Sequence, residues 1–364
     1  RPHYLKLNTL RDHFTGVPII ALTATATDKV VEDLKHILKL SEDCLIYRKS
    51  FFRENLIIKV KEKKTETDTL NKIIASLNGY YKDKSGIIYS HSRKACEKIT
   101  ARLQEEGLKV DFYHAGLNKK TREKIQADWL NNDLYIIVAT IAFGMGIDKS
   151  NVRFVIHFSM PLSVEGYYQE IGRAGRDGKL SDCIIYYGAQ DKLIHQKMLK
   201  RDKSKNPRKI AHNQQLNNKI EDMSLFLENI IDCKHYLLCN YFNEFIDHQV
   251  GFCKSHCDNC VNNSKNVVNK DVTELSQAIV NSVLALGDQA SNSKVKKFIR
   301  GSSEMGKYSA LKHFGIGRKL KDNIVERLLT NLVSNKYIKN IVVRNQFGFY
   351  NDKLKVYNKS KEIL

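Results

Sequence analysis

The sequence has no long apolar run, because none of its hydrophobic stretches approaches the ~20 residues that a helix needs to cross a bilayer. It also lacks the charged start, apolar core and cleavage site of a secretory signal peptide. Proline is scarce, with four residues in 364, while 42% of the residues are hydrophobic and 9% are aromatic. These features argue against a membrane-spanning segment, secretion by such a signal, and a proline-rich disordered chain. The composition and length predict a folded protein of two or three compact units.

Two nucleotide-related motifs are absent as well. The pattern Gly-x-x-x-x-Gly-Lys-[Ser/Thr] does not occur, since the only Gly-Lys pairs, Gly178-Lys179 and Gly306-Lys307, lack the hydroxyl residue that should follow. An Asp-Glu-x-His box does not occur either. The first motif would cradle nucleotide phosphates, and the second would hold magnesium. We therefore expect no complete phosphate-loop site in these residues, and the start at Arg1 rather than at methionine suggests an excerpt of a longer chain.

Positive charge is what the sequence has in excess. It holds 60 Lys and Arg against 40 Asp and Glu, which gives a formal net charge of +20 at pH 7. Such an excess favours a polyanionic partner, with nucleic acid as the first candidate. A basic surface without such a partner is the alternative that composition leaves open.

Short apolar runs alternate with amphipathic stretches over the first 200 residues. Strands that alternate with helices predict a parallel sheet covered on both faces. The predicted strands are 19–22, 86–90, 110–113, 136–139, 154–157 and 183–187, and the predicted helices are 28–40, 92–106, 118–131 and 163–172.

Polar stretches predict the connections. Residues 59–69 are charged and suggest an exposed connection. Residues 200–219 hold many Lys, Arg and Asn residues without apolar periodicity, so we place a domain boundary there. The remaining predicted elements are helices at 221–231, 233–245, 273–286, 293–299, 305–313 and 319–334, a linker at 262–270 and a β-hairpin over 337–357. Several helices followed by a hairpin predict a winged helix.

The most informative block is Gln-Glu-Ile-Gly-Arg-Ala-Gly-Arg-Asp-Gly at residues 169–178. Arg173 and Arg176 stand three apart, so on a helix or tight turn both guanidinium groups point to one side. Gly172, Gly175 and Gly178 around them let a backbone or a phosphate come close. A rigid fork of donors matches the oxygens of a phosphoryl group and stabilises the charge that develops during its transfer. A solvated basic turn is the alternative.

A glycine-containing loop at residues 139–149 directly follows a predicted strand, where open α/β sheets place ligand loops. Thr140 can offer its hydroxyl and backbone N–H to a phosphate, and Gly144 and Gly146 permit close approach. Asp148 could orient a water, an arginine or a metal-bound group. By itself this loop is explained equally well as a structural turn.

With these two blocks the chain resembles the RecQ family of DNA helicases, close to the Bloom-syndrome type. The resemblance covers roughly the first half of the chain, and the motifs stand in the family's order. Residues 21–26 resemble helicase motif III, residues 86–93 motif IV, residues 113–117 motif IVa, residues 139–149 motif V and residues 165–178 motif VI.

The resemblance implies a nuclear, ATP-dependent 3′-to-5′ DNA helicase of DNA repair, recombination and replication. It implies that Arg173 and Arg176 are catalytic residues that reach the ATP phosphates, with Gly146, Asp148 and Gln169 in the same nucleotide site. ATP and Mg²⁺ would be bound mainly by a first RecA-like lobe, which is expected to be mostly absent from this sequence.

The resemblance also implies that Ser90, Arg93 and Thr140 line a track for single-stranded DNA. RNA helicases with a DEAD box typically carry His-Arg where this chain has Gln169 and Glu170, which favours DNA over RNA. The expected partners are single-stranded DNA and duplex junctions, without a membrane. A non-catalytic DNA-binding module is the alternative, because the phosphate loop is absent.

The cysteines predict a metal site. Cys253, Cys257 and Cys260 offer three thiolates within one short segment, and Cys233 lies twenty residues upstream. Four thiolates at ~2.3 Å would close a tetrahedral structural zinc site. Disulfides are the alternative, which the missing secretory signal disfavours, and His256 or His248 could replace one cysteine. The remaining cysteines are predicted to be free thiols, with Cys239 in the core and Cys44, Cys96 and Cys183 scattered.

The carboxyl-terminal region predicts DNA contacts less specifically. Arg318 and Lys319 belong to a basic cluster, with Lys312, Lys321 and Arg327, that suits phosphate contacts or a merely solvated helix face. Phe347 and Phe349 fall at the predicted hairpin tip, where they could stack on a terminal base pair or pack on their own domain.

The predicted fold is α/β with a RecA-like parallel-sheet lobe. The predicted domains are a remnant of the first RecA-like lobe (1–52), a second RecA-like lobe (53–200), a helical zinc-binding module (201–262) and a winged-helix DNA-binding domain (270–364).

Overall fold

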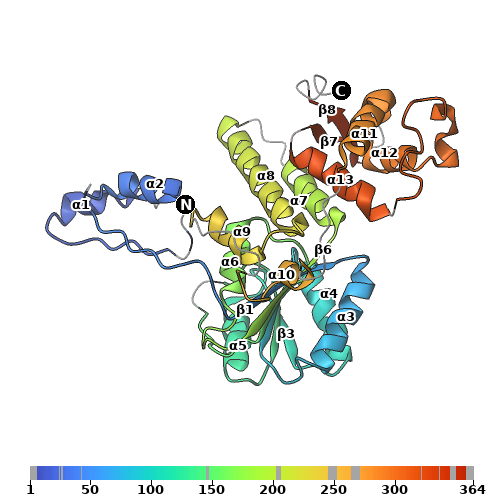
Figure 1. Cartoon of the computed structure of the whole chain (residues 1–364). Coiled ribbons are helices and arrows are strands. Elements are labelled where there is room, and N and C mark those ends of the chain that lie inside the picture. The colour runs from blue at the N-terminus through green and yellow to red at the C-terminus, as the bar shows by residue number, and fades with distance from the viewer. Residues whose placement is uncertain are drawn as a thin grey trace. The chain divides into compact units, whose positions relative to one another are not determined.

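The computed structural model divides the chain into two compact units. One unit comprises residues 1–195 and 204–265, and the other comprises residues 196–203 and 266–364 (Figure 1). The structure describes residues 6–23, 25, 28–41, 43–144, 147–201, 206–244, 252–263, 271–320, 322–335, 337–344 and 350–357.

The first unit is built on a six-stranded parallel sheet with the strand order β1-β6-β5-β2-β4-β3. Every residue of β2, β4 and β5 is buried, as expected for strands covered on both faces. The strands are β1 (Leu56–Glu62), β2 (Gly86–Tyr89), β3 (Val110–Tyr113), β4 (Ile136–Ala139), β5 (Phe154–His157) and β6 (Ser181–Tyr187).

Helices cover both faces of this sheet, with α3 (Glu66–Asn78) and α4 (Arg93–Glu105) on one side and α5 (Lys119–Leu130) on the other (Figure 1). The main core cluster joins residues of α3 and α4 to the strands. Side-chain caps fix where the helices begin, since Ser92 accepts from the N–H of Ala95 at the start of α4. The other helices of this unit are α1 (Thr9–His13), α2 (Asp28–Leu38), α6 (Val164–Ile171), α7 (Ala189–Arg201, which runs on into the second unit), α8 (Pro207–Glu228), α9 (Lys234–Tyr241) and α10 (Asp258–Asn263).

Two predictions for the start of the chain are wrong. Residues 19–22 form no strand, and the side chains of Ile20 and Leu22 are 82% and 90% exposed. Residues 59–69 are not an exposed connection, because they complete β1 and begin α3. Their lysines have partners that the sequence does not reveal: Lys59 Nζ lies 2.7 Å from Asp182 Oδ1, and Lys63 Nζ lies 3.0 Å from Asp191 Oδ1.

The predicted polar stretch 200–219 is helical from residue 207 onward, as part of α8. The buried apolar residues of α8 gather near its end, at Ile220, Met223, Phe226 and Leu227. The first half of the helix therefore shows no apolar stripe from which a helix could be predicted.

The second unit packs helices against a two-stranded antiparallel hairpin, which confirms the predicted hairpin and fold class. The predicted helix 305–313 is wrong, because a 3₁₀ helix ends at Tyr308 and turns follow, with Gly315 at a φ of +74°. The elements are α11 (Thr273–Leu286), η2 (Gly287–Gln289), α12 (Asn292–Ile299), η3 (Ser303–Tyr308), α13 (Asp322–Ser334), β7 (Ile338–Arg344) and β8 (Tyr350–Val356).

A membrane-spanning helix is not found, since none in the described part of the chain combines the required length and apolar character.

A buried lysine ties the loop after β4 to the end of α5. Lys149 is 7% exposed, and its Nζ donates to Trp129 O (2.7 Å), Leu130 O (3.1 Å) and Asn132 Oδ1 (2.8 Å). The ammonium group thus satisfies carbonyls at a helix end that have no partner within the helix.

Replacing Lys149 with Met should lower the free energy of unfolding by about 1–3 kcal/mol, because the acceptors lose their donor inside the protein. Urea unfolding followed by circular dichroism measures this change. The exposed Lys120 on the same helix is the matched control, and equal stability of the Lys149→Met and Lys120→Met variants would contradict this role.

Candidate arginine loop and metal centre

The two predicted arginines lie in the loop that joins α6 to β6, residues 172–180 (hereafter the arginine loop). Arg176 Nη1 donates to Ile147 O (2.9 Å) and lies 2.7 Å from Asp148 Oδ1. The side chain of Arg176 is 36% exposed and that of Asp148 is 86% exposed, so solvent reaches this ion pair. The structure therefore brings the side chains of Arg176 and Asp148 together, and their shared role in a nucleotide site stays a prediction.

Arg173 lies deeper, against residues 139–149. A Cβ placed on Gly144 would sit 3.2 Å from Arg173 Nη2, so the glycine allows this close approach. Arg173 Nε is buried and has no hydrogen-bond partner among the described residues. A buried guanidinium N–H without an acceptor suits an anionic ligand such as a phosphate.

Gln169 and Glu170, near the end of α6, have different partners. Gln169 Nε2 donates to Thr25 Oγ1 (3.0 Å), a residue of the segment that resembles motif III. Glu170 Oε2 instead lies 2.8 Å from His157 Nε2 of β5, where both side chains are buried. His157 also stacks on Tyr89, with ring centroids 5.3 Å apart. His157 was missed in the sequence, because a histidine at the end of an apolar strand gives no sign of its partner.

The predicted DNA-contacting residues of this unit lie at the carboxyl ends of neighbouring strands. Ser90 N donates to Ala139 O (2.9 Å), and Thr140 N donates to Tyr113 O (3.2 Å). The Ser90 hydroxyl is buried without a partner in the described residues, whereas Thr140 is half-buried and Arg93 is exposed. A Cβ on Gly116 would sit 3.1 Å from Arg93 Nη1. The structure thus places Ser90, Thr140 and Arg93 near this end of the sheet, where Ser90 offers little surface, and their contact with single-stranded DNA stays a prediction.

The four predicted metal-binding cysteines come together. Their Sγ atoms all lie within 4.8 Å of one another, with Cys233, Cys253 and Cys257 buried and Cys260 half-buried. A tetrahedral zinc–thiolate site places its sulfurs ~3.8 Å apart, and the Cys257–Cys233 separation is 3.9 Å. The donor set therefore fits zinc, and a disulfide alternative finds no support because all eight cysteines are free.

Close contact between the thiols perturbs their protonation. Hydrogen bonding from Cys253 and Cys257 lowers the pKa of Cys233 to about 4. The contacts with Cys233 and Cys257 raise the pKa of Cys253. Zinc would stabilise all four thiolates at once.

The other cysteines and histidines considered in the sequence analysis lie outside the cysteine cluster where the structure describes them. His256 Nδ1 is 2.6 Å from Glu54 O, so this histidine faces the lobe and is not part of the cysteine cluster. Cys239, Cys96 and Cys183 are buried free thiols, and Cys44 is half-buried. His248 lies outside the described residues.

The cysteine-bearing segment attaches to the free edge of β1. Ile58 N donates to His256 O (2.9 Å), and Val60 N donates to Asp258 Oδ2 (2.7 Å). From α9, His235 Nε2 lies 3.0 Å from Leu56 O. This segment therefore satisfies backbone groups that an edge strand would otherwise expose.

Only some of the residues of the second unit that are predicted to contact DNA lie in the described part of the chain. Lys312, Arg318 and Lys319 are exposed, and Arg318 and Lys319 precede α13, which begins at Asp322 and not at 319 as predicted. Gly146, Lys321, Phe347 and Phe349 lie outside the described residues, as does the side chain of Arg327.

Comparison with known families gives matches along the chain. Residues 66–178 match the helicase conserved C-terminal domain, residues 189–261 match the RecQ zinc-binding domain, and residues 266–364 match the RQC domain.

Similar curated proteins are helicases from several eukaryotes. The chain is 36% identical over its whole length to the ATP-dependent helicase SGS1 of Saccharomyces cerevisiae and covers 25% of that protein. It is 39% identical to the ATP-dependent DNA helicase hus2/rqh1 of Schizosaccharomyces pombe, with 96% of the chain and 26% of that protein covered. It is 42% identical to the RecQ-like DNA helicase BLM of Xenopus laevis, with 75% of the chain and 20% of that protein covered. The chain thus spans about a quarter or less of these relatives.

Among solved structures, Saccharomyces cerevisiae Dbp5 bound to RNA and ADP BeF3 shares 19% identity at a TM-score of 0.42, over 54% of this chain and 48% of that one. This likeness is too weak to carry an argument.

The six-stranded parallel sheet, the arginine loop and the cysteine cluster define the carboxyl-terminal lobe of a helicase motor with an attached zinc-binding module. The chain belongs to the RecQ family of helicases.

The cysteine cluster should hold about one zinc ion per chain, which elemental analysis measures. Replacing Cys257 with Ser should lower both the zinc content and the thermal unfolding temperature, because metal binding contributes directly to folding. Cys44→Ser, outside the cluster, is the control. A well-folded protein without metal would contradict the zinc assignment.

Proposed function

We propose that this chain supplies the second motor lobe, the zinc-binding module and the winged helix of an ATP-driven 3′-to-5′ DNA helicase. The observation that carries the proposal is the arginine loop, where Arg176 meets Asp148 and Arg173 keeps a buried N–H without an acceptor among the described residues. Support also comes from the similarity to proteins named as ATP-dependent DNA helicases.

In this proposal Arg173 and Arg176 bind the phosphates of ATP, whose hydrolysis with Mg²⁺ supplies the free energy for unwinding. Arg176 exchanges the exposed carboxylate of Asp148 for phosphoryl oxygens, and its planar guanidinium stabilises the negative charge that develops on them. Arg173, held against Gly144, links the same phosphates to the loop after β4.

Thr140 and Arg93 contact the single strand in this proposal, because they lie at the carboxyl edge of the sheet next to that loop. Exposed Arg318 and Lys319 bind duplex phosphates. The net charge of +20 favours DNA binding by the whole chain. Three further points stay predictions. They are the separation of DNA strands by Phe347 and Phe349, action in DNA repair, and a nuclear location.

Replacing Arg176 with Ala in the full-length protein should reduce DNA-stimulated ATP hydrolysis by about 10³-fold or more, as expected when a catalytic arginine is lost. Binding of a fluorescent single-stranded oligonucleotide should change little, because Arg176 faces Asp148 and not the strand ends. ATP turnover at the unmutated rate would disprove the assigned role.

A non-catalytic DNA-binding module is the second candidate, favoured by the absence of a phosphate loop from this sequence. The isolated chain should then bind forked DNA and hydrolyse no ATP above background.

Unwinding of duplexes with either a 3′ or a 5′ tail by the full-length protein tests the polarity. If RNA stimulated ATP hydrolysis by the full-length protein as much as DNA does, the choice of DNA as its nucleic acid would be contradicted.

A further inference from the structure

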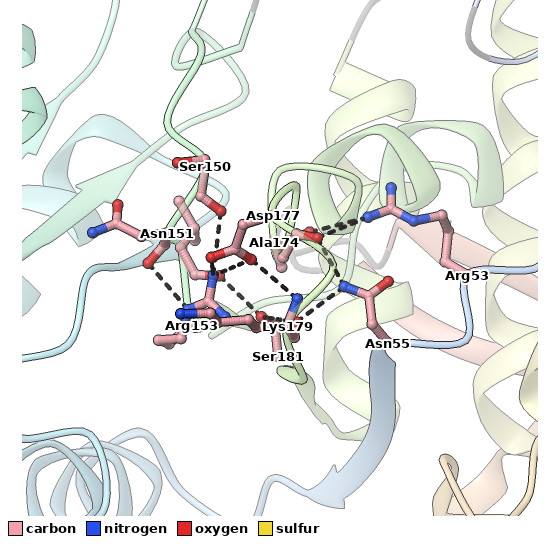
Figure 2. Close-up of polar contacts among 11 residues, drawn as sticks. Arg53, Asn55, Ser150, Asn151, Arg153, Ala174, Asp177, Lys179 and Ser181 are labelled. Carbon is pink, nitrogen blue, oxygen red and sulfur yellow. Dashed lines mark hydrogen bonds and ion pairs between the residues drawn. The ribbon is translucent and has the colours of Figure 1, made fainter.

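The arginine loop is held on one side by two residues that lie just before β1. Asn55 Nδ2 donates to Gly175 O (2.8 Å) and to Lys179 O (3.0 Å), so one amide group joins the two ends of the segment that carries Arg176. Arg53 Nη2 donates to Gly175 O as well, at 3.2 Å. Figure 2 shows Arg53 and Asn55 pointing into the loop from the same side.

Asn55 is itself fixed by the sheet. Its carbonyl accepts from Ser181 N (2.9 Å), and the next residue, Leu56, pairs with Ser181 in the β1–β6 ladder. The amide therefore projects from a rigid strand end, which is the kind of support that positions functional groups accurately.

Gly175 is shaped to accept this contact. Its φ is +56°, and a Cβ there would lie 2.4 Å from Asn55 Nδ2 and 2.7 Å from Lys179 O. What comes close to this glycine is thus the Asn55 amide and a backbone carbonyl rather than a phosphate. Gly178, at a φ of +77°, has nothing within 4 Å of the place that a Cβ would occupy and only turns the chain.

The other side of the loop is held by an ion pair. Arg153 Nη2 lies 2.6 and 2.8 Å from the two carboxylate oxygens of Asp177, and it also donates to Ser150 O (3.2 Å) (Figure 2). The backbone of Gly175 contributes too, because its N–H donates to Val152 O (3.0 Å). Residues 175 and 177 are both anchored, so the backbone of Arg176 between them has little freedom.

We propose that Asn55, assisted by Arg53, is a positioning residue for Arg176. This inference rests on the proposed function, in which Arg176 stabilises the phosphoryl group. Asn55 touches no substrate and acts by holding the carbonyls of Gly175 and Lys179, on either side of Arg176, at a fixed separation. A carboxylate cannot replace it, because an ionised Asp has acceptors only and would face two carbonyl oxygens.

The first test uses the 364-residue chain and needs no catalysis. In Asn55→Asp, amide hydrogen exchange of the peptide covering residues 172–180 should become about tenfold faster, since local opening loses two hydrogen bonds. Asn118→Asp is the matched control, because Asn118 caps α5 and an Asp caps equally well. Unchanged exchange at 172–180 in Asn55→Asp would overturn the proposal, whatever the protein's activity.

The second test measures ATP hydrolysis by the full-length protein. Asn55→Asp should lower kcat by about 10- to 100-fold with little change in KM for ATP, as expected for a misplaced catalytic group. In an Arg176→Ala background the same change should have no further effect, because residues that act through one another are not additive. If Asn55→Asp lowered kcat by the same factor in the Arg176→Ala background, the role of Asn55 would be merely structural. Absence of hydrolysis by the unmutated full-length protein would disprove the proposed function and leave the exchange result to decide the loop contact.

Discussion

The hydrogen-bonded pairing of β1 with β6 is the constraint on which the rest of the first unit depends. Through this ladder Leu56 is aligned with Ser181, so the strand that starts after Asn55 lies beside the strand that starts after the arginine loop. The loop thereby leads directly into β6 and is hydrogen-bonded to the side chain of Asn55, the residue before β1. The opposite edge of β1 carries the cysteine-bearing segment through Ile58 and Val60. One strand of seven residues thus connects the proposed catalytic arginine to the metal centre.

Burial and ion pairing explain how the charged strand β1 packs within the sheet. Ile58 is fully buried, whereas Lys59 reaches Asp182 on β6, and Asp182 also accepts a hydrogen bond from Tyr81 (2.6 Å). A buried carboxylate with both a cation and a hydroxyl as partners is far less costly than an isolated one. Burial together with this hydrogen bond raises the pKa of Tyr81, so the phenol remains a donor. The charged pattern of β1 is therefore part of the packing.

Much of the sheet could be predicted from the sequence, and the reason is local. Ile136–Ala139 is a short apolar run, and Phe154–His157 is apolar except for its last residue, as is typical of buried parallel strands. β1 could not be predicted in this way, because Lys59, Lys61 and Glu62 look like a solvated connection until their partners are known. The spacing of the cysteines indicated a metal site but left His256 and His248 open as ligands, and the structure is what brings the four thiols together. The contact of Asn55 with Gly175 joins residues 120 positions apart, and no pattern in one sequence reports it.

The attachment of the metal-binding segment to β1 also bears on how such chains could be recombined. A cut between the sheet lobe and the cysteine cluster would break the main-chain hydrogen bond from Ile58 to His256 and would leave Leu56 O without His235. The lobe and the cluster are therefore one transferable block, and a chimaera that exchanges one without the other needs a compatible β1.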